Sequence, residues 1–142
     1  MSAVPIMVPT RGTVDFRYDT SEDIVYARPR WTLETAADVT RWYEMHVRYF
    51  GTRFRLPKDM ITVQDNFHVA PEVFGLWQRY CVRLQESLVR FAAYVTTNPR
   101  VDLGMAGSGM RHSAGTIETK TVAEAVSGIT DLRAVVSKTR TS

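Results

Sequence analysis

The residues best suited to chemistry lie together in one short stretch, Asp65-Asn66-Phe67-His68. They follow Met60–Gln64, an apolar run typical of a buried central strand. In open α/β sheets, ligands bind beyond the carboxyl ends of the strands, so these side chains would lie where a ligand binds. A carboxylate beside an imidazole can transfer protons near neutral pH. In the alternative interpretation, Asp65 or Asn66 caps the next helix and His68 lies on the surface.

Other residue types that carry chemistry are few and far apart in the chain. The three histidines, His46, His68 and His112, fall in separate predicted elements and lack the spacing of metal ligands. Cys81 is the only cysteine, and it falls on the apolar side of a predicted helix, where core packing is its expected role. We therefore predict no catalytic residues, no metal site and no cofactor.

A glycine-rich segment, Leu103–Gly109, precedes Arg111. It lacks the Gly-Lys-Ser/Thr sequence that follows a phosphate-binding loop, and it comes after a predicted short helix instead of a strand. Arg111 could bind an anion, whereas the competing interpretation is a mobile loop without a ligand.

The tryptophans suggest a contact surface, since three of them occur in so small a chain. Trp42 falls beside the apolar stripe of its predicted helix, with Arg41 and Arg48 nearby, and an exposed tryptophan with arginines is typical of an interaction hot spot. Phe67 would extend such a patch. The alternative is that Trp42 shields the edge of a sheet.

The elements that must position these residues begin with a hairpin and a helix. Thr13–Tyr18 and Ile24–Arg28 have strand patterns, and Pro29 is expected to end the second strand. Thr32 can cap the helix Leu33–Phe50. The predicted buried stripe of this helix consists of Ala36, Val39, Tyr43, Val47 and Phe50.

The rest of the chain continues to alternate between strand and helix patterns. The predicted elements are the strand Met60–Gln64, the loop Asp65–Val69, the helix Pro71–Leu88, the strand Phe91–Thr96, the short helix Arg100–Ala106, the strand Gly115–Glu118 and a last helix that begins with the capping box Thr121–Glu124. The order β-β-α-β-α-β-α-β-α predicts an α/β fold with a single mixed sheet flanked by about four helices.

Length, charge and composition limit the class of protein. The 142 residues suit one domain over residues 13–132, between an apolar N-terminal arm (1–12) and a basic C-terminal tail (133–142) that is expected to fray. The net charge of +3 is too small to favour a nucleic-acid partner, and no apolar stretch is long enough to span a membrane. A single cysteine is typical of the cytoplasm.

The element order resembles that of the STAS family, which is named for sulfate transporters and anti-sigma factor antagonists. The similar segments are Met60–Asp65, Phe91–Val95 and Thr121–Val126. The resemblance implies a STAS-like fold and a regulatory domain that binds a protein partner. Family members that act as antagonists carry Asp-Ser-Ser/Thr-Gly after the central strand, and a serine there is phosphorylated. This chain has no hydroxyl group at positions 65–68, so the resemblance implies a domain without that phosphorylation switch.

Three functions are therefore open. The first is a non-enzymatic regulatory domain with a protein partner. The second is a small ligand-binding protein or enzyme that uses Asp65, His68 and Arg111. The third is a self-assembling structural subunit, such as a homodimer, for which the apolar N-terminal arm is the hint.

Overall fold

The computed structural model describes residues 12–96 and 116–141, and their side chains up to Ser137. The predicted short helix, the glycine-rich segment, Arg111 and His112 lie outside this part of the chain. The strands are β1 (Thr13–Asp19), β2 (Ile24–Leu33), β3 (Lys58–Val63), β4 (Asn66–Val69), β5 (Val89–Val95) and β6 (Thr116–Thr119), and the helices are α1 (Ala36–Gly51), α2 (Pro71–Ser87) and α4 (Val122–Thr141). The structure confirms the α/β fold, with three helices in the described residues.

The six strands form one mixed sheet, in which five follow the order β1-β2-β3-β5-β6 and the sixth, β4, pairs with β2. β1 is antiparallel to β2, and the pairs β2–β3, β3–β5 and β5–β6 are parallel. β2 has two successive partners along its other edge. Its first residues, Ile24–Ala27, pair with β3, and its last residues, Arg30–Leu33, pair with β4.

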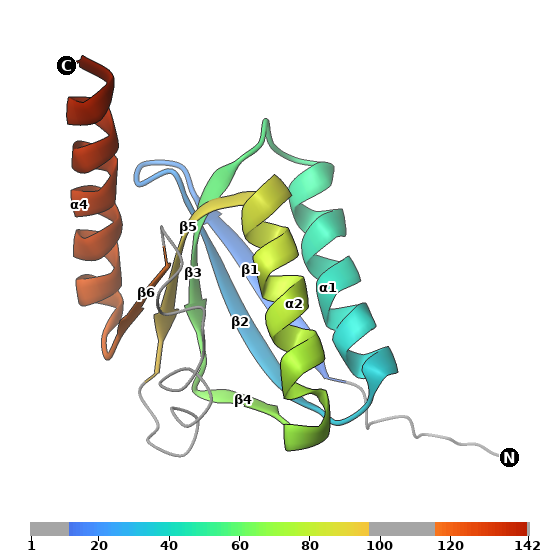
Figure 1. Cartoon of the computed structure of the whole chain (residues 1–142). Coiled ribbons are helices and arrows are strands. Elements are labelled where there is room, and N and C mark those ends of the chain that lie inside the picture. The colour runs from blue at the N-terminus through green and yellow to red at the C-terminus, as the bar shows by residue number, and fades with distance from the viewer. Residues whose placement is uncertain (1–11, 97–115, 142) are drawn as a thin grey trace, which may run out of the picture.

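Helices cover the two faces of the sheet unequally (Figure 1). α1 and α2 pack on one face, here called the inner face, over a core that includes Trp31, Trp42, Phe67 and Trp77. α4 packs on the opposite, outer face, and its contacts with the sheet are mainly to β3, β5 and β6. The outer faces of β1, of β4 and of the last residues of β2 are therefore left without a helix among the described residues.

Pro29 does not end β2, contrary to the sequence-based expectation. The strand continues to Leu33, and Pro29 lies between the residues that pair with β3 and those that pair with β4. Proline lacks an N–H, so it suits this gap between two partners. The helix therefore begins later than predicted: Thr35, not Thr32, is its N-cap, and Thr35 and Asp38 form a capping box.

The predicted loop Asp65–Val69 is mostly a strand. After β3 ends, the chain forms β4, and Trp31 faces Phe67 across β2 and β4. Its four residues alternate between polar and apolar types, but so short a run gives only a weak strand signal. Burial of the Phe67 ring beneath α1 and α2 holds the strand in place.

The segment from Arg133 onward also differs from the prediction, because α4 continues through it to Thr141. Arg133 joins this helix to the sheet: its Nε lies 2.7 Å from the carboxylate of Asp59, and its terminal nitrogens donate to the backbone carbonyls of Glu22 and Asp23. Asp59 is buried and also accepts hydrogen bonds from Arg90. The arginine expected in a frayed tail is therefore a tertiary contact.

Candidate functional site

The uncovered part of the outer face brings together side chains from two neighbouring strands. Arg28, Arg30 and Thr32 alternate along β2 with buried residues, and Asn66 and His68 do the same along β4. Successive side chains of a strand point to opposite faces, so all five lie on the outer face. We call these five residues the outer strand face.

The register of β2 and β4 sets the arrangement of this surface. Arg30 faces Asn66, and Thr32 faces His68. The side chains of Asn66 and His68 are exposed and make no hydrogen bond to another residue in the described part of the chain. These two side chains and those of Thr32 and Arg30 offer an amide, an imidazole, a hydroxyl and a guanidinium group to an approaching molecule.

Asp65 fixes the start of β4 to β2. Its carboxylate accepts from Arg28 through both guanidinium positions, with Nη2 2.8 Å from Oδ2 and Nε 3.4 Å from Oδ1. The side chain of Asp65 is 30% exposed and that of Arg28 is 49% exposed. A bidentate pair of this kind orients both groups. The carboxylate is thus engaged by Arg28, and the N-cap position of α2 is taken by Ala70.

Trp42 and Phe67 do not belong to the surface, so the prediction of an exposed aromatic hot spot is wrong. Each is only 2% exposed. Their rings lie 6.5 Å apart between centroids, and Trp77 packs against both. The buried stripe of α1 is Val39, Trp42, His46 and Phe50. The helix is therefore rotated relative to the predicted stripe, because burying the large Trp42 ring stabilises more than burying Val47.

The chemistry of other candidate groups is restricted by burial. Cys81 is fully buried, and burial raises the pKa of its thiol well above the usual range, which disfavours the reactive thiolate. Burial lowers the pKa of His46 to about 4, so its imidazole is neutral at physiological pH. In the described parts of the chain, no three His, Cys, Asp or Glu side chains gather as metal ligands would.

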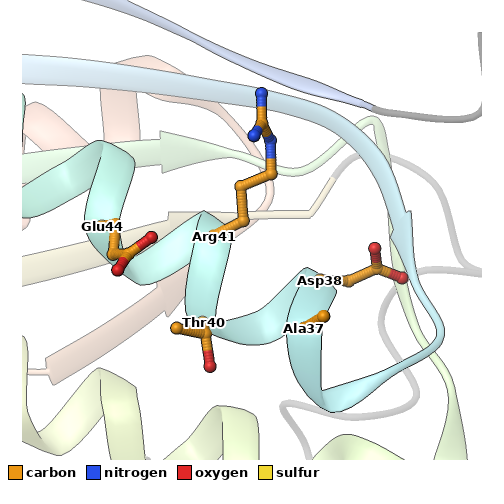
Figure 2. Close-up of a pocket in the computed structure, with 5 residues that line it drawn as sticks. All are labelled: Ala37, Asp38, Thr40, Arg41 and Glu44. Carbon is orange, nitrogen blue, oxygen red and sulfur yellow. The ribbon is translucent and has the colours of Figure 1, made fainter. Parts of the chain in front are cut away.

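A shallow hollow of about 390 Å³ lies along the first half of α1 (Figure 2). Its lining residues all come from this one helix: Ala37, Asp38, Thr40, Arg41 and Glu44. In Figure 2 the side chains of Arg41 and Thr40 point to different sides of the helix, and Asp38 is already used in the capping box. The lining groups therefore do not converge on a common ligand position.

Sequence reasoning identified Asp65, Asn66 and His68 but missed Arg28, Arg30 and Thr32. The missed signal is the alternation of apolar and polar residue types from Ala27 to Leu33, which matches the alternation of buried and exposed side chains in β2. The expectation that proline ends a strand hid this pattern.

Among the described residues, no helix has the length and apolar character needed to cross a membrane. No protein-family model matches this chain, and no curated protein matches it either. The resemblance to the STAS family therefore stays a prediction from element order.

Proposed function

We propose that this chain is a non-enzymatic regulatory domain that binds a protein partner through the outer strand face. The observation that carries the proposal is the ordered polar surface beyond α4, where Asn66 and His68 stand exposed beside Arg30 and Thr32. Their strands are hydrogen-bonded to one another, so the surface is preorganised, and preorganisation lowers the entropy lost on binding.

The charges of this surface suggest the chemistry of the partner. Arg28 is paired with Asp65, and Arg30 lies 3.5 Å from Asp15 of β1. Positive and negative groups thus alternate without a large excess of either sign. A mixed polar protein surface complements such a pattern better than a polyanion does, because nucleic acids require an excess of basic groups.

Asp65 is a poor candidate for a general base, which supports a binding role over a catalytic one. A general base needs a carboxylate that can reach the substrate proton, whereas both oxygens of Asp65 accept from Arg28.

The second candidate function is ligand binding by Asp65 and His68, and it is favoured by their position just after the carboxyl end of β3.

The proposal is tested by affinity capture from native lysate with quantitative mass spectrometry. The test variant is Asn66→Ala/His68→Ala, which removes two exposed side chains. The matched control is Glu44→Ala/Glu86→Ala, which removes two exposed side chains from α1 and α2. We expect one protein to be retained equally by the wild type and the control and to fall about tenfold or more with the test variant.

Equal retention by all three forms would contradict a role for the outer strand face. If no protein is retained and a small molecule stabilises the wild type but not the Asn66→Ala/His68→Ala variant, the ligand-binding function replaces the proposal.

A further inference from the structure

β1 is an edge strand whose outer edge is open among the described residues. It pairs with β2 along its whole length, from Thr13 to Asp19, and no other described strand lies beside it. An open edge presents unpaired N–H and C=O groups, which can add a further strand.

Pro29 determines which backbone groups of β1 face that edge. In an antiparallel pair, facing residues alternate between pairs that exchange both hydrogen bonds and pairs that exchange none. Val14 faces Pro29, which has no N–H, so this pair exchanges none. Because the two kinds of pair alternate, Phe16 and Tyr18 also exchange no hydrogen bonds with the residues that they face on β2. The N–H and C=O groups of Val14, Phe16 and Tyr18 therefore point toward the open edge.

The sequence of β1 is complementary to itself about Phe16. When two copies of the strand run antiparallel around this residue, Phe16 faces Phe16 of the second copy, Val14 faces Tyr18, and Asp15 faces Arg17. Residues whose backbone groups point outward then pair with one another. Asp15 and Arg17 fall at the closer, non-hydrogen-bonded positions, where opposite charges attract across the strands.

The two neighbouring registers with the same backbone parity are disfavoured by charge. An axis through Asp15 places this residue opposite itself, and an axis through Arg17 does the same to Arg17. Like charges directly opposite each other destabilise a strand pair. We propose that a second copy of this chain pairs with the β1 edge, antiparallel and centred on Phe16, to form a two-fold homodimer with one continuous sheet.

Half-buried aromatic side chains on the inner face would add to this interface. The ring of Phe16 stacks on that of Tyr49 with centroids 4.5 Å apart, and the ring of Tyr18 lies 4.8 Å from that of Phe54. All four side chains are half-buried. A second copy along β1 would cover their remaining apolar surface, and aromatic residues are enriched in such contacts.

Two charge-reversal variants test the dimer. Asp15→Arg makes both facing positions positive, and Arg17→Asp makes both negative. The side chains of Asp15 and Arg17 are 61% and 65% exposed, so the fold should tolerate either change. Sedimentation equilibrium over a range of concentrations should show a wild-type dimer and an about tenfold or greater rise in Kd for each variant.

A mixture of the two variants tests whether the charges of the facing residues control the dimer. When Asp15→Arg meets Arg17→Asp, every facing pair is again of opposite charge, so the mixture should recover the wild-type Kd, as should the double variant Asp15→Arg/Arg17→Asp. The control Glu86→Arg on the exposed side of α2 should leave the dimer unchanged.

Three results would overturn the proposal. A wild-type protein that stays monomeric at the highest concentration reached would exclude the dimer. Dimers that persist in both single variants would assign the contact to another surface. Failure of the mixture to recover dimers would contradict charge pairing between Asp15 and Arg17 across the two copies. None of these results depends on the partner proposed for the outer strand face.

Discussion

Successive side chains of β2 and β4 point to opposite faces of the sheet, and the two faces differ sharply in burial. Trp31 and Phe67 point inward and are only 4% and 2% exposed, whereas their neighbours Thr32 and His68 point outward and are exposed. Two helices pack on the inner face, whereas no helix in the described part of the chain covers the outer strand face. The same strands therefore supply core packing through one set of residues and an exposed polar surface through the other.

The largest loss of stability is expected from removing an aromatic side chain that is buried on the inner face. Trp42→Ala should lower the free energy of unfolding by about 3–5 kcal/mol, because it leaves a cavity between Phe67, His46 and Trp77. Denaturant unfolding measures this change. The adjacent exposed residue provides the control, since Arg41→Ala should stay within about 0.5 kcal/mol of the wild type. Equal effects of the two substitutions would mean that Trp42 is not in the core.

The inner face should also respond to acid through His46. Its imidazole is 1% exposed, lies against the rings of Phe16 and Trp42, and donates from Nδ1 to the carbonyl oxygen of Trp42. Burial lowers the pKa of His46 to about 4, below the ordinary value of 6.5. The unfolded chain therefore binds the proton first, and stability falls as the pH drops from 6.5 toward 4.

The difference between these pKa values corresponds to about 3 kcal/mol once the pH is below 4. Unfolding of the wild type and of His46→Phe, compared between pH 7 and pH 4, isolates this contribution from that of the carboxylates. The wild type should lose about 3 kcal/mol more than the variant. Parallel losses in the two proteins would show that His46 is not the group responsible.

A smaller loss of stability is expected from breaking the ion pair that joins the start of β4 to β2. Asp65→Asn removes the ion pair with Arg28 and should cost about 1 kcal/mol or less, because both side chains are partly exposed. Asp15→Asn is the matched comparison, since its pair with Arg30 is more exposed and should contribute still less. Thermal unfolding distinguishes the two. A loss of several kcal/mol with Asp65→Asn would mean that β4 depends on this pair.

The smallest effect on stability is expected from the outer strand face itself. Asn66→Ala and His68→Ala remove exposed side chains that make no hydrogen bond to another of the residues that the structure describes. Each should change the free energy of unfolding by less than about 0.5 kcal/mol. A larger change, measured by denaturant unfolding, would indicate a structural role and weaken the assignment to binding.

Strong periodicity made the helices and most strands predictable from the sequence. α2 begins at Pro71 as expected, and Thr121 and Glu124 form the predicted capping box of α4. The errors arose where tertiary packing overrides local signals. Pro29 is tolerated because β2 changes partners there, and β4 exists because Phe67 is buried under two helices.

The candidate site was only partly predictable for the same reason. Asp65, Asn66 and His68 were identified from their position after β3, but Arg28 reaches Asp65 from 37 residues earlier in the chain. No local pattern encodes that contact. The exposure of Trp42 was also misjudged, because helical spacing alone did not distinguish two adjacent stripes of α1.

The central claim is that the outer strand face binds a partner without stabilising the fold. Its most direct test is to replace Arg30, Thr32, Asn66 and His68 singly by alanine and to measure, for each variant, both partner retention and the free energy of unfolding. We predict that retention falls for at least two of the four while every unfolding free energy stays near the wild-type value. Unchanged retention in all four variants, or losses that simply follow reduced stability, would contradict the claim.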